Sequence, residues 1–516
     1  MLTRRTFVRL AATGAASAAA ATLVGGDANR LRSAERGRVL VYGATPAGIM
    51  AAIAAARQGA EVELLLGESP LGGMLSSGLS VADRGDDRVI GGLARRFYVD
   101  LGRYYGRPIA WHYEPHVAHK IFKAMLATYG VATRPGVLAK VLKDGATIRA
   151  IRTTAGTVLR AQVFVDASYE ASLCSAAATT VYGRESQSTY GEPAAGYGLR
   201  VKAYEFEPSG AACRSMPGLT AQPTVRIGAA DNRIMSFTYR LCVTADADRI
   251  PFSPPPGYDA ERYAALTDPA TDPFVFRLYH LPNGKFDVNG GGNLLDTDFV
   301  GGNVDFCTAD RARRQQIAQA HADYQAGLLY FLATDTRVPA ATREQAASLG
   351  LAPDEFTNTG NWPKQLYIRE ARRLVGDYVM RQSDITTDLT KADAIGMGSY
   401  KADSHAVQRF LGGRATVYAE GGIPPEFALV RPYQIPLRAL LPKARQAANL
   451  LSAMPLSVSH VVWSSIRMEP QFMITGEAAG VAAALALSED VPLSRIGGPD
   501  LTRILEGHGV VTQLAT

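Results

Sequence analysis

Apolar residues near the start of the chain follow the pattern of a strand–helix–strand unit. An apolar run at residues 39–42 stops at Gly43, which predicts a buried parallel strand ending in a tight turn. The alanine-rich segment 49–57 predicts a helix, and Gly59 is a glycine of the kind that commonly ends one. A second apolar run at residues 62–66 predicts another strand. Together these segments predict a βαβ unit.

The following pattern predicts a second layer and a return to the same sheet. Residues 115–130 have the spacing of an amphipathic helix. Residues 131–142 and 147–158 have the pattern of short strands in a β-meander. Residues 163–168 form an apolar strand that ends in small residues. We expect this strand to rejoin the sheet beside a bound ligand.

Between residues 183 and 430 prolines, aromatic residues and loops dominate. Within this region the segments 309–332 and 366–381 have helical patterns. Beyond it, residues 449–453 predict a strand, and residues 473–487 predict a helix rich in glycine and alanine.

These elements predict an α/β fold. We expect a Rossmann-like nucleotide-binding domain, a parallel sheet with a β-meander, that is split across both chain ends and carries an inserted α+β substrate domain. The expected boundaries are 1–35 for a signal peptide and linker, 36–182 and 431–495 for the two parts of the nucleotide-binding domain, 183–430 for the substrate domain and 496–516 for a C-terminal tail.

The N-terminus has the features of an export signal. Arg4, Arg5 and Phe7 precede a weakly hydrophobic, alanine-rich stretch, as in a twin-arginine signal peptide. We therefore expect the twin-arginine export machinery as a partner and a periplasmic or secreted location. That route moves folded proteins, which suits an enzyme loaded with its cofactor before export. A basic tail is the alternative, whereas a stable membrane span would need ~20 strongly apolar residues.

Composition narrows the function classes. The formal charge is +6, of which Arg4, Arg5 and Arg9 contribute three, so the remainder is too weakly basic to indicate nucleic-acid binding. The four cysteines form no C-x-x-C motif, so we expect no metal site. We interpret them as small buried hydrophobic residues, with one disulfide left open.

The turn after the first strand has the features of a dinucleotide site. A helix N-terminus directs backbone N–H groups and a positive dipole end at its occupant, commonly a pyrophosphate. Gly43 and Gly48 fit the G-x-G-x-x-G pattern, but Thr45 stands at its second glycine. The acidic residue that normally binds the adenosine ribose would fall on Leu66, and Glu68 is the substitute from the following loop.

Several segments resemble one enzyme family. They are residues 41–49, 71–74, 165–171, 182–186, 366–373, 433–436 and 459–470. In order and sequence they are similar to the FAD-dependent oxidoreductases of the two-dinucleotide-binding-domain flavoprotein type. The closest group within it is a secreted one often labelled putative xanthan lyase. In this family threonine is common at the position of Thr45.

The resemblance implies an FAD cofactor and a set of residues around it. Gly476 and Gly480 are expected near the flavin end of the cofactor, although a tightly packed Gly/Ala helix would explain these two glycines equally well. The expected FAD-binding residues are Gly43, Thr45, Pro46, Ala47, Gly48, Glu68, Gly72, Gly73, Met74, Asp166, Ala167, Gly476 and Gly480.

Flavin chemistry needs a group that accepts a proton close to the substrate. His460 is the first candidate, because it lies between the last predicted strand and the Gly/Ala helix; a structural histidine is the alternative. Tyr400 and His405 belong to a polar segment that would bind sugar hydroxyls or transfer protons; a solvated loop is the alternative. Arg369 is the fourth candidate.

Other polar groups have two interpretations each. Arg369, Arg372 and Arg373 would share one face of the predicted helix and bind either a carboxylated substrate or Glu370 or Asp377. Residues 111–116 are aromatic and polar, which suits a sugar site or a domain interface. We expect Arg467 and Glu469 to form a local ion pair.

The sequence therefore predicts an exported FAD-dependent oxidoreductase. It would oxidise a small polar organic molecule, for which a carbohydrate is one candidate, by hydride transfer to flavin N5 and pass electrons to an unidentified acceptor. The alternatives are a polysaccharide (uronate) lyase with a structural flavin and a binding protein without turnover.

Overall fold

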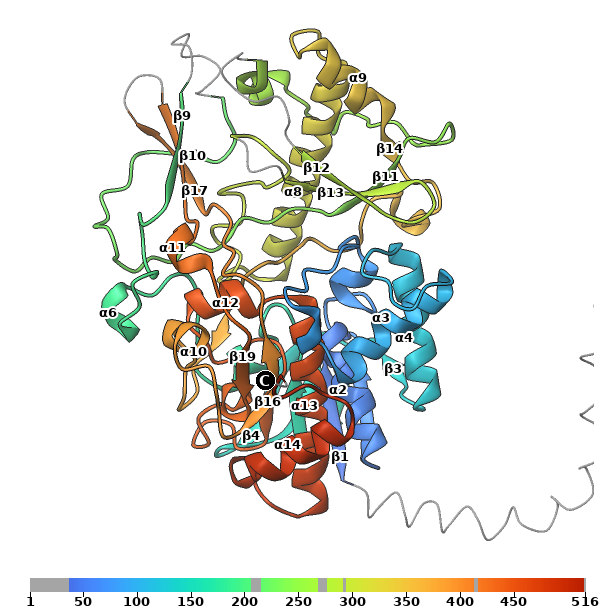
Figure 1. Ribbon diagram of the computed structural model, residues 1–516, viewed down its shortest axis with the longest axis vertical. Coiled ribbons are helices and arrows are strands. Elements are labelled where there is room, and N and C mark those ends of the chain that lie inside the picture. The colour runs from blue at the N-terminus through green and yellow to red at the C-terminus, as the bar shows by residue number, and fades with distance from the viewer. Residues whose placement is uncertain (1–36, 206–214, 268–275, 291–293, 413–415, 515–516) are drawn as a thin grey trace, which may run out of the picture.

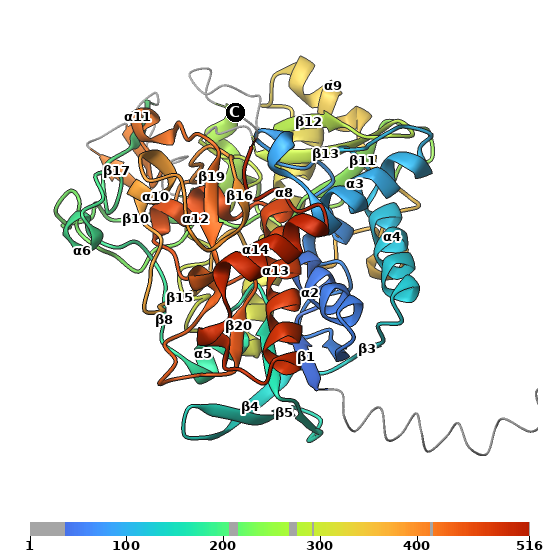
Figure 2. The same cartoon turned by 60° about the horizontal axis from the view of Figure 1, so that its bottom comes forward.

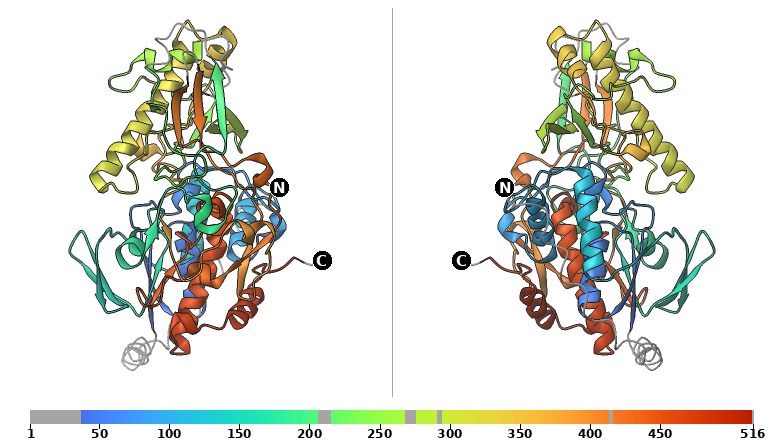
Figure 3. Two further views of the ribbon diagram at one scale, coloured as in Figure 1. Left: turned by 90° about the vertical axis from the view of Figure 1, so that its left-hand side faces the viewer. Right: turned by 90° about the vertical axis from the view of Figure 1, so that its right-hand side faces the viewer.

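The computed structural model describes residues 37–205, 215–267, 276–290, 294–412 and 416–514. The predicted signal peptide lies outside the described residues. Elements from both ends of the chain lie together in the lower half of Figure 1, and elements from the middle of the chain form the upper half. The side views in Figure 3 show the same two halves.

A five-stranded parallel sheet forms the centre of the lower half. Its strand order is β20-β7-β1-β2-β3, so the sequence-predicted βαβ unit and the returning strand are confirmed. Leu450, from the C-terminal part of the chain, pairs with Phe164. The strands are β1 (Arg38–Tyr42), β2 (Glu61–Leu65), β3 (Thr133–Arg134), β7 (Val163–Asp166) and β20 (Leu450–Ser452).

Both faces of this sheet are covered. Val39 and Val41 belong to the hydrophobic cluster on the helical face, whereas Leu40 and Tyr42 belong to the cluster under the β-meander. The meander confirms the sequence prediction and lies across the sheet from the helices (Figure 2). Its strands are β4 (Leu138–Asp144), β5 (Thr147–Thr153) and β6 (Val158–Arg160).

Two apolar helices, α2 (Pro46–Arg57) and α13 (Glu469–Ser488), pack directly against each other. A Cβ atom at Gly480 would lie only 2.1 Å from the carbonyl oxygen of Ala51, so the two backbones touch. Within the described residues α13 is the one helix long and apolar enough to cross a membrane, and 83% of its most apolar window is buried inside the structure. The neighbouring helices are α3 (Gly92–Tyr104), α4 (Pro115–Thr128) and α14 (Gly498–Gly507).

Two four-stranded sheets and a long helix form most of the upper half (Figures 1 and 3). The helix α8 (Arg311–Thr334) matches the sequence prediction for residues 309–332. One sheet has the order β10-β17-β18-β9 and the other β12-β13-β11-β14. The strands are β9 (Val201–Glu205), β10 (Leu219–Thr220), β11 (Leu241–Thr244), β12 (Phe276–His280), β13 (Lys285–Gly290), β14 (Gly350–Leu351), β17 (Gln408–Gly412) and β18 (Thr416–Glu420). A further helix is α9 (Ala340–Ser348).

The helix predicted for residues 366–381 was wrong. This segment is extended and contains the short strand β15 (Arg373–Leu374), which pairs with β8 (Thr180–Val181). Arg369 donates to the carbonyl oxygen of Ser236 at 2.6 Å, and Tyr367 bridges Thr238. Contacts between distant segments therefore outweigh the local helical preference.

Shorter elements connect these layers. The antiparallel pair β16 (Ala394–Gly398) and β19 (Tyr433–Pro436) lies beside α13. The remaining elements are α5 (Ser172–Ala177), α6 (Gln187–Tyr190), α10 (Gln382–Thr386), α11 (Pro425–Ala428), α12 (His460–Ile466), η1 (Gly73–Ser76), η2 (Asp87–Val89), η3 (Ala260–Thr267), η4 (Thr357–Thr359), η5 (Leu437–Leu440) and η6 (Leu493–Arg495).

Candidate active site

The turn between β1 and α2 is held by Thr45 and by two glycines. Thr45 is the N-cap of α2: its Oγ1 accepts the N–H of Gly48 at 3.3 Å and donates to the carbonyl oxygen of Ala167 at 2.7 Å. Gly43 has φ +101°, and a Cβ at Gly48 would lie 1.8 Å from the Gly43 carbonyl oxygen. The threonine therefore ties the helix start to the end of β7.

Other expected cofactor residues surround this turn. Pro46 and Ala47 are buried in the first turn of α2. Gly72 and Gly73 both have positive φ values, +89° and +50°, at the start of η1. The N–H of Met74 donates to Tyr169 Oη at 3.0 Å. These positions let the backbone pass close to the β1–α2 turn.

The Asp166 carboxylate accepts hydrogen bonds from the loop that follows β7. Its Oδ1 accepts the N–H and hydroxyl of Ser168 at 3.0 and 2.7 Å, and its Oδ2 accepts the N–H of Cys174 at 2.8 Å. Burial raises its pKa above the ordinary value. The carboxylate thus fixes the chain after β7, which places Ala167 against Thr45.

For the adenosine ribose the sequence analysis named Glu68 and missed Glu170, whose carboxyl group lies near that of Glu68. Glu68 is exposed on the loop after β2. Glu170 is buried, and burial, with the nearby Glu68 as a second cause, raises its pKa to about 7. Its Oε2 has no protein partner among the described residues. In the sequence, Glu170 lies among the small residues that follow β7, and this position was the feature that could have identified it.

The first turn of α13 carries buried polar groups. Glu469 Oε1 accepts the Tyr169 hydroxyl at 2.7 Å, and burial raises the pKa of Glu469 to about 8. Both side-chain amide atoms of Gln471, and Ser77 Oγ after η1, are buried without a protein partner in the described chain. A helix N-terminus and unsatisfied polar atoms, together with the glycine turn, fit a dinucleotide such as FAD.

Two positions expected at the flavin end face a helix instead. Cβ atoms at Gly476 and Gly480 would lie 2.2 and 2.1 Å from the carbonyl oxygens of Ala47 and Ala51. The structure therefore assigns these glycines to the packing of α13 on α2. This is the tightly packed helix that the composition also allowed.

A cavity of about 400 Å³ brings together three of the four catalytic candidates. Tyr400, His405 and Arg369 all line it. Its walls come from the β10-β17-β18-β9 sheet, from the loop after β16 and, through Asp83, from the N-terminal part of the chain. The polar segment around Tyr400 is thus a cavity wall and not a freely solvated loop.

His405 lies between two carboxylates. Its Nδ1 is 2.6 Å from Asp298 Oδ2, and its Nε2 is 3.6 Å from Asp403 Oδ2. Arg369 Nη2 lies 2.8 Å from the other oxygen of Asp298. Burial alone would raise the pKa of Asp298, but the Arg369 guanidinium, and the charge of His405 when its ring is protonated, outweigh it and hold the pKa below its usual range. An ionised Asp298 only accepts, so Nδ1 of His405 carries a proton, and in the neutral ring Nε2 is the nitrogen that can accept one.

Of the two roles expected for Tyr400, its geometry favours hydrogen bonding over proton transfer. Its hydroxyl donates to Asp83 Oδ1 at 3.1 Å, and burial raises its pKa well above the ordinary value. It stays protonated at neutral pH and is a hydrogen-bond donor. Asp403 is held ionised, because His405 and Arg467 outweigh the effect of its burial on its pKa.

His460 does not line the cavity and belongs to a buried ionic network. Its Nδ1 is 2.8 Å from Glu370 Oε1, and its backbone N–H donates to Glu185 Oε2 at 2.9 Å. Arg373 joins the same two carboxylates at 2.7 and 2.6 Å. The structural histidine, the alternative to catalysis, is the interpretation that this geometry supports.

The other ionic expectations have mixed outcomes. Arg373 pairs with Glu370, as one alternative predicted, whereas Asp377 contacts Arg445 instead. The expected Arg467–Glu469 pair was wrong, because Arg467 lies 3.0 Å from Asp403. Arg372 donates to the carbonyl oxygen of Cys307 and stacks on Tyr182, 4.9 Å from its ring centre.

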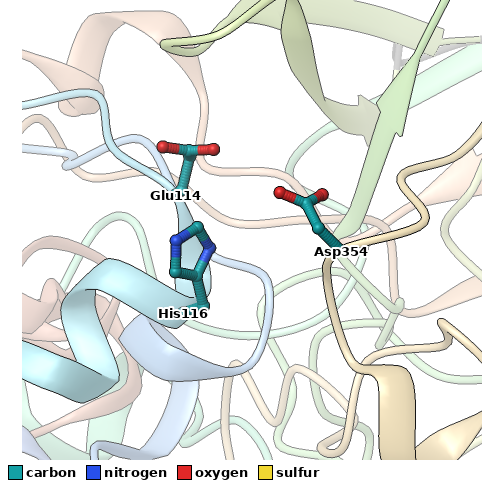
Figure 4. Close-up of side chains that lie close together, drawn as sticks. All are labelled: Glu114, His116 and Asp354. Atoms are coloured by element: carbon teal, nitrogen blue, oxygen red, sulfur yellow. The ribbon is translucent and has the colours of Figure 1, made fainter. Parts of the chain in front are cut away.

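The aromatic and polar segment 111–116 is an interface between the two halves. Glu114, His116 and Asp354 lie close together (Figure 4), with potential ligand atoms within 4.8 Å of one another. Lys285 Nζ lies 2.6 Å from both Glu114 and Asp354, so its ammonium already pairs with these carboxylates and would repel a cation. Lys285 is in β13, so this cluster joins the N-terminal part to the upper half.

The cysteines agree with the sequence interpretation where they can be compared. Cys174, Cys242 and Cys307 are buried and free, as expected of small hydrophobic residues. Cys213 lies outside the described residues.

Comparisons with known proteins give one family. The family model described as FAD dependent oxidoreductase matches residues 38–505. No curated protein matches the chain.

Solved structures resemble it only weakly. BexE, from studies of oxidation during BE-7585A biosynthesis, is 14% identical, with a TM-score of 0.24, over 49% of this chain and 43% of that chain. This chain therefore spans less than half the length of BexE. Thioredoxin reductase from Lactococcus lactis is 18% identical, with a TM-score of 0.17, over 25% and 35% of the two chains. THI4 from Thermovibrio ammonificans is 16% identical, with a TM-score of 0.21, over 40% and 81%.

Proposed function

The chain belongs to the FAD-dependent oxidoreductase family, and from this premise we propose that it oxidises a small polar organic substrate in the cavity beside His405. The observation that carries the proposal is the Asp298–His405 pair, 2.6 Å apart in the cavity wall. Such a pair supplies a positioned proton acceptor, which oxidation of an alcohol or amine requires.

FAD is the cofactor of this family, and three segments fit it. The β1–α2 turn from Gly43 to Gly48 would hold the pyrophosphate, and residues 72–74 would lie along the cofactor. The first turn of α13, with Gln471, would meet a polar edge of the cofactor. When bound, FAD supplies the hydride acceptor for the oxidation.

The residues of the cavity would accept the substrate proton, hold the accepting ring in place and donate a hydrogen bond. His405 accepts the substrate proton at Nε2, while Asp298 holds the ring through Nδ1 and stabilises the cation that forms. Arg369 keeps Asp298 ionised. Tyr400 donates a hydrogen bond, at present to Asp83, and is a candidate for orienting a substrate oxygen. The family match favours oxidation and gives no support to the polysaccharide lyase.

The same proposal includes a division of the chain. Residues 36–182 and 431–495 would form the FAD-binding domain, and residues 183–430 the inserted substrate domain. The pairing of β20 with β7 supports a domain built from both chain ends. The polar cavity with several tyrosines makes a carbohydrate one candidate substrate.

Export is proposed on the sequence alone. Arg4 and Arg5 precede the alanine-rich stretch in the manner of a twin-arginine signal. Replacing both with lysine should retain the protein in the cytoplasm of an expressing bacterium, as seen by cell fractionation. Unchanged export would contradict this part of the proposal.

Anaerobic reduction of the purified holoenzyme tests the function. Candidate sugars, amines and hydroxy acids are mixed with the enzyme, and bleaching of the flavin absorbance is followed. A substrate should bleach wild type, and His405→Gln should slow bleaching by about 100-fold while retaining FAD. Equal rates in the two proteins, or no bleaching by any class, would overturn the proposal.

A further inference from the structure

We propose that the cavity contains a binding slot for a carboxylate, formed by Arg409 and Lys202 on either side of Ala419. The slot deepens the proposed function, on which it rests, by giving the substrate class: a polar organic acid.

The sheet places the two cations around a small residue. In β17 and β18, Arg409 is directly opposite Ala419, and in β18 and β9, Ala419 is directly opposite Lys202. Side chains at paired positions of neighbouring strands lie on the same face of a sheet. All three residues line the cavity. The small side chain of Ala419 therefore leaves space between the side chains of Arg409 and Lys202.

Arg409 is buried and has unsatisfied donors. It is 1% exposed, and its Nε and Nη1 have no hydrogen-bond partner among the described residues. A buried donor without an acceptor costs about 1–3 kcal/mol, and more when it is charged. A bound carboxylate would remove this cost, because its two oxygens match the guanidinium fork.

The other buried arginines of the cavity differ from Arg409 in having acidic partners. Arg240 makes a bidentate pair with Asp287, at 2.8 Å for both contacts. Arg369 pairs with Asp298 at 2.8 Å and Arg467 with Asp403 at 3.0 Å. Arg409 is thus the buried arginine of this lining for which no carboxylate contact is found in the described chain.

The charge of the lining favours an anionic ligand. Basic side chains outnumber the acidic ones, so the cavity carries an excess of positive charge. The charged lining residues are Arg200, Lys202, Arg240, Arg277, Arg369, Lys401, Arg409 and Arg467, with Asp83, Asp296, Asp298, Asp403 and Glu420.

Titration calorimetry of the FAD-loaded enzyme with three matched sugars tests the slot. D-Glucuronate carries a carboxylate, D-glucose is its neutral counterpart, and D-glucose 6-phosphate carries a dianion. We expect glucuronate to bind at least about 10-fold more tightly than glucose, as one charge-assisted contact gives. Glucose 6-phosphate binding more tightly than glucuronate would overturn the carboxylate assignment.

Four variants test the residues. Arg409→Met should abolish the preference for glucuronate, whereas Arg409→Lys should retain part of it. Ala419→Leu keeps both cations but fills the gap, so it should abolish the preference too. Arg311→Met, the control, removes an exposed charge from α8, outside the cavity, and should leave the preference for glucuronate unchanged. Full glucuronate affinity in Arg409→Met or Ala419→Leu would overturn the slot.

Stability distinguishes a binding arginine from a structural one. Because Arg409 has unsatisfied buried donors, Arg409→Met without ligand should melt no lower than wild type. A marked fall would mean that Arg409 has a structural partner and would overturn the proposal. Flavin bleaching by neutral sugars alone would leave the oxidoreductase function intact and remove the slot. Carboxylate binding through Arg409 without bleaching by any compound would leave the slot intact and overturn the oxidoreductase function.

Discussion

The hydroxyl of Thr45 donates a 2.7 Å hydrogen bond to the carbonyl oxygen of Ala167, 122 residues further along the chain. The Thr45 Oγ1 also caps α2, because it accepts the N–H of Gly48. The side chain that replaces the second glycine of the dinucleotide motif thus joins the two strand ends that flank the proposed FAD site. Its loss should affect both the fold and the cofactor.

Thr45→Val should lower the free energy of unfolding by about 1–2 kcal/mol, because it removes an N-cap and a buried hydrogen bond. Thr45→Ser keeps the hydroxyl and should stay close to wild type. Urea denaturation gives the stability, and flavin released on denaturation gives the FAD content, which should fall only in Thr45→Val. Equal behaviour of the two variants would contradict the role of the hydroxyl.

Asp298→Asn should slow anaerobic flavin reduction by about 100-fold with FAD retained. The neutral amide can still accept from Nδ1–H but no longer stabilises the ring cation by charge, so His405 loses much of its driving force as a base. Stopped-flow absorbance measures the rate. Asp305→Asn, which removes an exposed carboxylate that pairs with Arg313, serves as the control and should leave the rate unchanged.

Glu469 should make the FAD-free protein less stable as the pH rises. Its pKa in the folded protein is about 8 against an ordinary 4.5, so the folded chain keeps a proton that the unfolded chain releases between these values. Stability falls over this interval by up to ~1.4 kcal/mol per pH unit. Glu170 and Glu477, each with a pKa of about 7, contribute to the lower part.

Between pH 7 and 8 Glu469 should make the largest contribution to this decline. Urea denaturation at closely spaced pH values should show a clearly smaller decline there in Glu469→Gln than in wild type. A decline of the same size in both proteins would assign it to another group.

Gly480→Ala should destabilise the protein by about 1–3 kcal/mol or more, because the added methyl group would meet the Ala51 carbonyl oxygen at 2.1 Å. Gly507→Ala is the matched control in α14, where an added Cβ meets nothing within 4 Å. It should be neutral or slightly stabilising. Thermal melts compare the two, and equal melting temperatures would contradict the close contact of α13 with α2.

His460→Gln should reduce stability by about 1–3 kcal/mol, since it disturbs a buried network with Glu370 and Glu185. The rate of flavin reduction should not change, because His460 lies outside the cavity wall. Slower reduction at unchanged stability would return His460 to the catalytic candidates.

Local periodicity was sufficient for the central sheet. The runs at residues 39–42 and 62–66 and the glycine between them correspond to β1, β2 and their turn, because a strand buried on both faces has a continuous apolar run. The same reasoning failed for residues 366–381. Helical spacing there reflects arginines that contact distant carboxylates and carbonyl groups, and spacing alone does not distinguish such contacts from a helix face.

The sequence by itself determined the family, the βαβ unit with its glycine turn and the presence of His405, Tyr400 and Arg369 among the candidates. Only the tertiary structure decided that Asp298, 107 residues before His405, orients it, and that His460 lies in a separate network. It also placed Arg409 beside Lys202 across three strands. The physical reason is range: periodicity and turn chemistry act over a few neighbouring residues, whereas burial and ion pairing join positions that only the folded chain brings together.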